Sequence, residues 1–344
     1  MEQPSLGLRL ALRPMAAPRA PCLLRVKRPV AESVEDLLGF VDLNELRFKW
    51  PSAFIFFCGG SSSDIPKDAV SLRHYLLRER KIEARLDGKV ILAEAANQLY
   101  RDSSYTDLIT YEEDIAQISR VILLIAESAG SLAELGAFSS SEQIKKKLSV
   151  LMQQKYFDAE SFVRYGPIER LQKEDESRVA FFPWRVNGKG RVIKASVKDH
   201  VTEIVRFINK KIADVPETFQ FGLASNKDYR DFALVLWLTG VAQAITAERL
   251  SDYAEKMGHP ISRARVMNCF YCMKLAGWMD LCPYSGSTYL IRKTTVDVVD
   301  RFAFTAGSRL KDSSRWTALA QAAIKKEAGL PQPLLRTVME MRDG

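Results

Sequence analysis

The chain has 344 residues, of which 47% are hydrophobic and 27% are charged, and its formal net charge is +8. This composition excludes a wholly disordered protein, and the length favours two domains. No apolar run approaches the roughly 20 residues that a membrane-spanning helix needs, so we expect no contact with a membrane. The five cysteines are an odd and scattered set, which is typical of a reduced, cytoplasmic protein.

Residues 1–31 are rich in arginine and proline and show neither a helical nor a strand period. This composition predicts a basic, disordered leader. A basic arm that contacts RNA or DNA is the alternative.

From residue 32 to residue 212, short apolar runs alternate with amphipathic helical segments. The run at residues 53–58 is apolar on both faces and ends in two glycines, which is typical of a buried parallel strand. The alternation predicts an α/β fold with an open, parallel, doubly wound sheet of the flavodoxin-like type. In such sheets ligands bind at the carboxyl ends of the strands.

The alternation breaks at residues 213–227, which we predict to be a linker. The pattern of residues 228–344 predicts three helices followed by a β-hairpin, which is the element order of a winged helix-turn-helix domain. A helical extension that ends at Gly329 is predicted to follow. Four basic residues at the third helix and after the hairpin are placed to bind nucleic acid: Arg263, Arg265, Arg292 and Lys293. Winged helices also bind proteins, so the class of partner stays open.

The segment at residues 121–136 combines a buried strand, a turn at Gly130-Ser131 and a helix that carries Glu134. The positive end of the helix dipole would favour a negative charge there. However, Ser131 and Glu134 also match the S-x-x-E pattern of a capping box, in which the glutamate only binds a backbone N–H. The spacing alone does not separate a catalytic glutamate from a capping one.

Two further segments follow predicted strands and are candidates for the substrate pocket. Gly59, Gly60 and Ser61 offer backbone N–H groups and a hydroxyl to phosphate or ribose, although a tight turn would need the same glycines. Glu94 follows the second apolar run, and a surface or capping role is the alternative for it.

The strand, the turn and the Glu134-Leu-Gly136 helix resemble the motif of the nucleoside 2-deoxyribosyltransferases, in which a glutamate attacks the anomeric carbon. The resemblance implies that Glu134 is the catalytic carboxylate and that Ser128, Gly130 and Ser131 lie in the substrate site. Ser128 stands where that family has an aspartate, which argues against deoxyribose exchange more than against glycosidic cleavage. A carboxylate suits the chemistry, because cleavage of a ribosyl C–N bond builds positive charge on the sugar.

The order of the two domains, together with residues 101–116, resembles the effector proteins of retrons over about residues 32–327. The resemblance implies a toxic effector of anti-phage defence. A reverse transcriptase and its branched RNA–DNA product, msDNA, would hold it inactive, in an assembly that can extend to a higher-order oligomer. It also implies N-glycosidic hydrolysis of a nucleotide, and we expect NAD to be cleaved to nicotinamide and ADP-ribose.

Two alternatives stay open: a nucleotide-sensing winged-helix regulator that binds nucleic acid, and a nucleoside deoxyribosyltransferase. A Ser-His-Asp hydrolase is not supported, because the three histidines lie far apart and no nucleophile elbow accompanies them. Cys269 and Cys272 lie in an apolar helical segment, which favours core packing over zinc binding. We expect neither a metal nor a cofactor.

Overall fold

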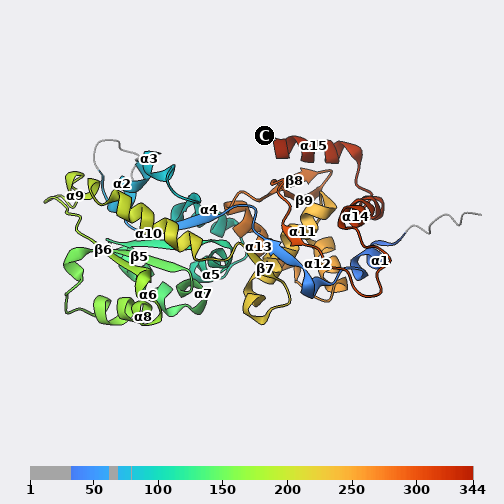
Figure 1. Ribbon diagram of the computed structural model, residues 1–344. Coiled ribbons are helices and arrows are strands. Elements are labelled where there is room, and N and C mark those ends of the chain that lie inside the picture. The colour runs from blue at the N-terminus through green and yellow to red at the C-terminus, as the bar shows by residue number, and fades with distance from the viewer. Residues whose placement is uncertain (1–31, 62–68, 79, 344) are drawn as a thin grey trace, which may run out of the picture. The chain divides into compact units, whose positions relative to one another are not determined.

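The computed structural model describes residues 32–61, 69–78 and 80–343 (Figure 1). The chain divides into two units, Met1–Glu32 and Ser33–Gly344, and the elements below belong to the second. The predicted leader at residues 1–31 lies outside the described residues. None of the helices in the described part is long and apolar enough to span a membrane.

Five parallel strands form the central sheet, in the order β3-β2-β4-β5-β6. Their bounds are β2 (Phe54–Cys58), β3 (Lys89–Leu92), β4 (Val121–Ala126), β5 (Leu148–Gln153) and β6 (Val179–Phe182). Counted along the chain this is the 2-1-3-4-5 order of flavodoxin-like sheets, so the predicted fold class is confirmed. The order reverses between β2 and β4, and a ligand site is expected where their carboxyl ends diverge.

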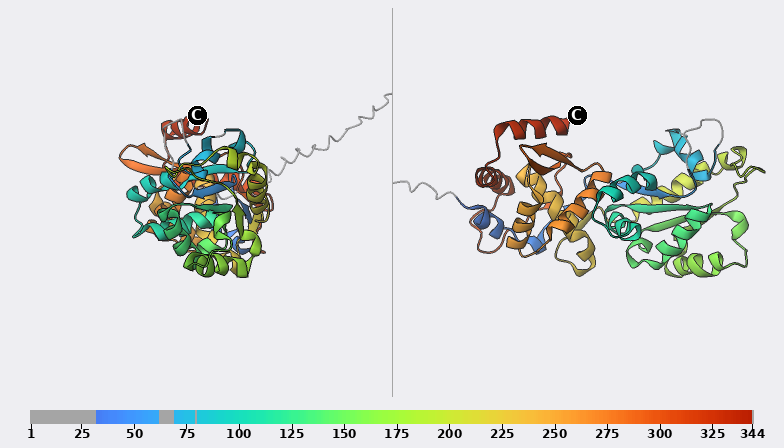
Figure 2. Two further views of the ribbon diagram at one scale, coloured as in Figure 1. Left: turned by 90° about the vertical axis from the view of Figure 1, so that its left-hand side faces the viewer. Right: turned by 180° about the vertical axis from the view of Figure 1, so that it is seen from behind.

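Helices cover both faces of this sheet, because its strands are apolar on both sides (Figures 1 and 2). Along β2, Phe54, Phe56 and Cys58 pack into one hydrophobic cluster, whereas Ile55 and Phe57 pack into another. The first cluster includes side chains from α4 (Ala93–Asp102), α5 (Leu108–Ile118), α6 (Ala129–Ser140), α7 (Glu142–Lys145) and α8 (Glu169–Glu174). The second includes α2 (Leu72–Arg78), α3 (Arg80–Glu83), α9 (Ala195–Lys198) and α10 (Val201–Ala213).

The chain after the parallel sheet forms three helices and a hairpin, in the predicted order. They are α11 (Arg230–Ala242), α12 (Ala247–Lys256), α13 (Arg263–Leu275), β8 (Met279–Tyr284) and β9 (Ser287–Arg292). The hairpin turn places Ser285 and Gly286 at positive φ, as a tight two-residue turn requires.

The C-terminal segment contains two helices, α14 (Ser313–Glu327) and α15 (Gln332–Asp343). The predicted helical end at Gly329 is therefore only the end of α14. Pro333 lies in the first turn of α15, where a proline costs no hydrogen bond, so the proline-rich stretch begins a helix instead of ending one.

A second, antiparallel sheet joins segments that the prediction had separated. β1 (Arg47–Lys49) pairs with β7 (Thr218–Gln220) on one side and with β10 (Val299–Arg301) on the other. Next to it, α1 (Val34–Gly39) packs on α14, where Trp316 Nε1 donates to the Leu37 carbonyl at 2.7 Å. Residues 33–49 thus pack with the C-terminal elements, although we assigned them to the unit at 32–212.

The expected linker at 213–227 is also not a bare connection. It contains β7 and part of a 3₁₀ segment, η5 (Ala224–Tyr229). The difference has a physical reason, because the pairing partners of β1 lie about 170 and 250 residues away and leave no local pattern. Four more short turns complete the element list: the 3₁₀ segments η1 (Leu43–Glu45), η2 (Gln154–Tyr156) and η4 (Glu176–Arg178), and the π-helical η3 (Arg164–Ile168).

Candidate active site

A cavity of about 360 Å³ lies at the carboxyl ends of the parallel strands. Its lining comes from the segments that follow β2, β4, β5 and β6: Gly60, Ser61, Glu127, Ser128, Gln153, Lys155, Tyr156, Trp184, Val186, Gly190 and Val192, with Val70 and Ser71 before α2. This is the edge at which a parallel sheet with reversed strand order binds its ligands.

Glu127 follows β4 directly and binds the N-terminus of α2. Its carboxylate accepts hydrogen bonds from the backbone N–H groups of Leu72 (2.6 Å) and Arg73 (3.0 Å). Burial raises the pKa of Glu127, whereas these N–H groups lower it by favouring the charged form. Glu127 thereby ties the end of β4 to the helix that follows β2.

The glycines after β2 are needed for close packing around this contact. A Cβ on Gly60 would lie 2.9 Å from Oε1 of Glu127, and Gly59 has φ +150° with Ile125 and Arg73 atoms 3.2 Å from where its Cβ would be. A side chain at either position would therefore force its neighbours apart. Gly60 and Ser61 still line the cavity, so their backbone remains beside the predicted substrate position.

Arg73 is 1% exposed and holds the end of β2 in place. Its Nε donates to the Gly60 carbonyl at 2.7 Å and its Nη1 to the Phe57 carbonyl at 3.2 Å. The guanidinium also forms a two-pronged ion pair with Glu94, whose side chain is half-exposed. Glu94, a predicted pocket residue, is thus the partner of a buried arginine.

Two serines, Ser128 and Ser131, cap the N-terminus of α6. Ser128 Oγ accepts from the N–H of Ser131 at 3.2 Å, and Ser131 Oγ accepts from the N–H of Ser128 at 2.9 Å. The capping box therefore begins three residues earlier than the S-x-x-E pattern suggests, and the capping interpretation of Glu134 is wrong.

This cap also occupies two predicted substrate-binding hydroxyls. Ser131 is 1% exposed, whereas Ser128 lines the cavity and Gly130 is exposed. Close packing does not require a glycine at position 136, because a Cβ there would meet no atom of another element within 4 Å.

Glu134 lies in the second turn of α6 and is not among the residues that line the cavity of about 360 Å³. Its Oε2 is buried without a hydrogen-bond partner among the described residues. Burial raises the pKa of Glu134, the positive charge of Arg73 lowers it, and Glu94 raises it. A buried carboxylate oxygen without a partner is costly, so such an atom marks a position where a bound group would be favourable.

A second carboxyl, Glu112 of α5, is influenced by Glu134. Burial raises the pKa of Glu112 to about 8, and the charge of Glu134 contributes to the rise. The thiol of Cys58 at the end of β2 also has a raised pKa, from burial and then from Glu112 and Glu134. At neutral pH Glu112 is therefore mostly a neutral acid beside Glu134.

Sequence reasoning missed Arg73, Glu112 and Glu127 as members of this cluster. Glu127 had a usable signal, because it directly follows a buried strand. Arg73 and Glu112 had none, since each is a single charged residue in a helical segment and their burial depends on distant elements.

The predicted nucleic-acid-binding residues are mostly engaged within the chain. Arg265 forms ion pairs with Asp231 at 2.8 Å and with Asp114 of α5. Arg292 and Lys293 are partly buried, and Arg292 Nε has no hydrogen-bond partner among the described residues. Arg263 is the exposed member of the four, and it pairs with Glu248 at 2.6 Å.

Helix α13 packs against the parallel-sheet elements. Asn268 Oδ1 accepts a hydrogen bond from Ser104 at 2.8 Å, and the Cys272 thiol lies 3.4 Å from the Tyr105 hydroxyl. Cys269 and Cys272 are both fully buried, as expected for core residues. In the described ranges, no group of three or more His, Cys, Asp or Glu side chains is arranged to hold a metal ion.

Comparison with known proteins agrees with the resemblance noted in the sequence. Two curated Escherichia coli proteins are similar to parts of this chain. "Retron Ec73 putative ribosyltransferase/DNA-binding protein" is 28% identical over 154 residues, which are 43% of this chain and 47% of the relative. "Retron Ec86 putative ribosyltransferase/DNA-binding protein" is 29% identical over 125 residues, which are 36% of this chain and 39% of the relative.

The chain thus spans less than half the length of these relatives. A family model described as "STM3845 retron effector protein" matches residues 69–281, which is more than half of the chain. The chain therefore belongs to the STM3845 retron effector protein family.

Proposed function

We propose that this chain is the toxic effector of a retron anti-phage defence system and hydrolyses the N-glycosidic bond of a nucleotide. The observation that carries the proposal is the buried Oε2 of Glu134 on the helix that follows β4, which has no hydrogen-bond partner in the described part of the chain. Family membership supports the defence role, and the word ribosyltransferase in the names of two relatives supports glycosidic chemistry.

NAD is the substrate we expect. The bond between ribose C1′ and the nicotinamide nitrogen breaks, and its electron pair leaves with nicotinamide. This leaving group departs neutral because its ring nitrogen is cationic in NAD, so no general acid is needed. The addition of water gives ADP-ribose and releases one proton.

Glu134 is the catalytic carboxylate in this mechanism. Positive charge develops on the ribose as the bond breaks, and a carboxylate held out of water stabilises that charge or attacks the anomeric carbon. Burial raises the pKa of Glu134, and the charge of Arg73 opposes that rise and so favours the ionised form that this role requires. The backbone at Gly59, Gly60 and Ser61, with Ser128 and Gly130, would receive the ribose and phosphates.

The proposed partners are the retron reverse transcriptase and its msDNA, which hold the effector inactive in the cytoplasm within a larger oligomer. The words "DNA-binding" in the names of the two relatives support contact with nucleic acid. In the winged-helix interpretation Arg263 is the residue exposed to a partner, since Arg265 is held by two aspartates.

The test is nicotinamide release from NAD by the full chain, alone and assembled with its reverse transcriptase and msDNA, within a panel of nucleotides. Glu134→Gln keeps the shape of the side chain and removes its charge. We expect it to lower turnover by roughly 100-fold or more. The matched control is Glu340→Gln, which removes one exposed carboxylate from α15 and should leave turnover unchanged.

Undiminished nicotinamide release by Glu134→Gln would overturn the assignment of Glu134. Two other results would redirect the proposal. Exchange of bases on deoxynucleosides would indicate a deoxyribosyltransferase, and duplex binding without turnover of any nucleotide would indicate a regulator.

A further inference from the structure

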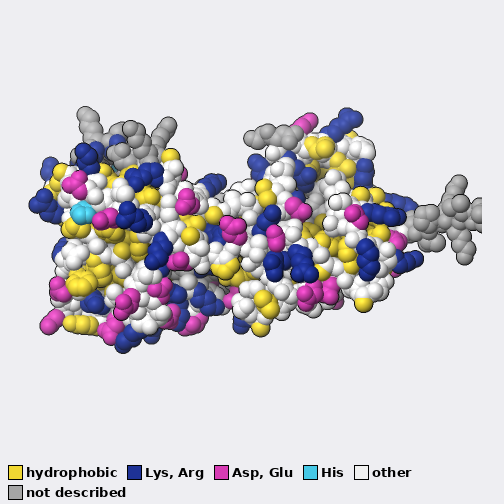
Figure 3. Space-filling view, in the orientation of Figure 1, with side chains coloured by type: hydrophobic (Ala, Val, Ile, Leu, Met, Phe, Trp, Pro, Cys, Tyr) yellow, Lys and Arg dark blue, Asp and Glu magenta, His cyan; other side chains and the backbone are white. Residues whose placement is uncertain are grey.

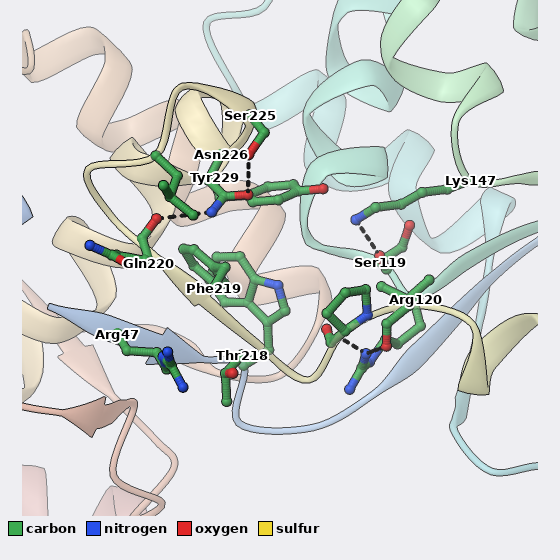
Figure 4. A pocket seen from close by; sticks show the side chains of 14 residues that line it. Arg47, Ser119, Arg120, Lys147, Thr218, Phe219, Gln220, Ser225, Asn226 and Tyr229 are labelled. Carbon is green, nitrogen blue, oxygen red and sulfur yellow. Dashed lines mark hydrogen bonds between the residues drawn. The ribbon is translucent and has the colours of Figure 1, made fainter. Parts of the chain in front are cut away.

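A second cavity, of about 430 Å³, lies at the opposite, amino-terminal end of the parallel sheet (Figure 4). Its lining comes from the segments before β4 and β5, from β1 and β7, and from the chain between β7 and α11. The volume lies within the range of roughly 300–1,000 Å³ that small-ligand sites occupy. We call it the Arg47 cavity. None of the residues that line it belongs to the group around Glu134.

Three aromatic side chains form one wall of the Arg47 cavity. The ring centroids of Trp50 and Phe219 are 5.0 Å apart, and those of Phe219 and Tyr229 are 5.2 Å apart. All three residues are only partly buried, so aromatic surface remains open to a ligand. Aromatic groups of this kind serve as stacking platforms for nucleobases.

Cations flank this aromatic wall on both sides. In Figure 4, Phe219 and Tyr229 lie between Arg47 on one side and Arg120 and Lys147 on the other. Arg47 is exposed, and it forms no ion pair within the described ranges. A base on the wall would therefore have positive charge available for a phosphate on either side of it.

Arg120 and Lys147 also hold backbone carbonyls of neighbouring segments, so part of their hydrogen-bonding capacity is used within the fold. Arg120 donates to the carbonyls of Val215 and Pro216, and Lys147 donates to those of Gln117 (2.8 Å) and Ser119 (2.7 Å). These contacts use carbonyl dipoles, while the carboxylate of Glu217 partly offsets the charge of Arg120. Lys147 forms no ion pair among the described residues. Burial, and after it the charges of Arg120 and Lys146, lowers the pKa of Lys147 to about 7, so a bound anion would favour its charged form.

The positive charge continues across the antiparallel sheet. Arg301 of β10 is the register partner of Arg47 on β1, and both residues are exposed. Like charges directly opposite each other destabilise a strand pair, so a polyanion that binds both would offset the repulsion. Two exposed acids, Glu217 and Asp300, lie nearby in the chain. Figure 3 shows Lys and Arg side chains gathered around the region of β7, with carboxylates at the margin.

We propose that the Arg47 cavity binds an unpaired nucleotide, with its base against Trp50, Phe219 and Tyr229 and its phosphates on Arg47 and Arg120. The nucleotide is one unit of a single nucleic-acid strand whose next phosphates reach Arg301, or it is a free nucleotide with the same chemistry. This site deepens the proposed contact with nucleic acid, on which it rests, and it lies at the end of the sheet opposite Glu134.

The test is equilibrium binding of a short, fluorescently labelled oligo-thymidylate to the full chain. It is performed in the Glu134→Gln background, so that the outcome does not depend on glycosidase activity. Phe219→Leu keeps apolar volume but removes the stacking face, and we expect affinity to fall roughly 5- to 150-fold. Phe219→Tyr should restore binding, and thermal melting of both variants checks that they fold.

Charge variants examine the phosphate-binding role of the arginines. Arg47→Glu should weaken binding and reduce the slope of log affinity against log salt by about 0.7 for each phosphate that the protein no longer neutralises. Arg336→Glu on α15 makes the same charge change at another exposed site and should bind as the parent does. In a competition arm, displacement of the strand by free thymidine monophosphate identifies a free-nucleotide site, whereas failure to displace it identifies a strand site.

Three results would overturn the proposal. The first is the absence of oligo-thymidylate and thymidine monophosphate binding at low salt. The second is unchanged affinity in both folded variants, Arg47→Glu and Phe219→Leu. The third is loss of binding in Arg263→Glu with Arg47→Glu unaffected, which would place the nucleic-acid interface on the winged-helix elements instead.

Discussion

Acidic side chains predominate at one end of the parallel sheet and basic side chains at the other, although Arg73 and Lys155 lie at the first and Asp175 and Asp214 at the second. Around the carboxyl ends lie the acidic side chains Glu94, Glu112, Glu127 and Glu134, and around the amino ends lie Arg120, Lys146, Lys147, Arg178 and Lys211. The fold accounts for the sign at each end. Helices begin near the carboxyl ends of the strands and end near the amino ends, so their dipoles favour acids at the first and bases at the second.

Some of these charges are satisfied by the backbone, and others by ion pairs such as those of Lys211 with Asp175 and of Glu94 with Arg73. The charges that have neither kind of partner are the informative ones. Glu127 binds N–H groups at the start of α2, and Lys147 binds carbonyls at the end of α5. Glu134 keeps a buried oxygen without a partner, and Arg47 keeps an exposed guanidinium without an ion pair, as far as the described residues extend. Each end of the sheet thus has one charge that folding alone does not explain.

The largest expected effect concerns Glu112, whose pKa is raised to about 8 by burial and by Glu134. A raised carboxyl pKa contributes stability below the unfolded value of about 4.5, and that stability is lost as the pH rises through about 8. Relative to Glu112→Gln, the wild-type chain should lose about 5 kcal/mol of unfolding free energy across this window. Denaturant unfolding at a series of pH values measures the difference.

Glu340→Gln serves as the control for the loss of one carboxylate, because it changes net charge equally at the surface. Parallel stability curves for wild type and Glu112→Gln would show that Glu112 is not held in its neutral form. In that case the acid beside Glu134 would be a carboxylate, and the contrast between the two ends would be larger than we infer.

Lys147 should show the opposite sign at the other end of the sheet. Its pKa is lowered to about 7 by burial and neighbouring cations, so the unfolded chain binds more protons between about pH 7 and pH 10.5. Relative to Lys147→Met, the wild-type chain should gain up to about 5 kcal/mol as the pH rises through this window. The same unfolding series measures it, and a difference that shrinks with rising pH would contradict the surplus of positive charge.

Arg73 is the next test, because it supports the acidic end with a buried cation. Arg73→Met leaves the carbonyls of Phe57 and Gly60 without their donor and Glu94 without its partner, and should cost about 3 kcal/mol. The pH at which activity develops should also rise, since Arg73 lowers the pKa of Glu134. Arg78→Met, at the exposed end of the same helix, is the control.

A stability loss in Arg73→Met without any shift of the pH–activity profile would make Arg73 purely structural. Glu134 would then owe its ionised form to another group. The free energy of unfolding thus reports how Arg73 stabilises the end of β2, and the pH–activity profile reports its electrostatic effect on Glu134.

The sequence predicts the parallel sheet, because each of its strands is marked by a local pattern of apolar residues. The strands that end at Cys58 and Ala126 are continuous apolar runs, and their order along the chain with helices between them fixes the fold class. The antiparallel sheet of β1, β7 and β10 was missed, because its three short strands pair across long separations and are not apolar enough to stand out.

The candidate site divides in the same way. Glu134 could be singled out because the strand–turn–helix motif around it resembles that of the nucleoside 2-deoxyribosyltransferases, whereas Arg73 and Glu112 become meaningful only once separate elements bury them. Residues 128–134 contain two overlapping patterns for capping, Ser128-x-x-Ser131 and Ser131-x-x-Glu134. Only the backbone position of the helix start decides between them.

The smallest expected effect follows from that choice of cap. Ser131→Ala removes one side of the capping box and should cost about 1 kcal/mol of unfolding free energy, because the N–H of Ser128 loses its acceptor. Glu134→Gln should change stability little, since the affected oxygen has no hydrogen-bond partner among the residues that the structure describes. In the proposed reaction the order is reversed, with turnover largely kept by Ser131→Ala and largely lost by Glu134→Gln. If instead Glu134→Gln destabilised the chain as much as Ser131→Ala, the Glu134 carboxylate would be making a structural contact. The catalytic carboxylate at the carboxyl ends of the strands would then have to be another side chain.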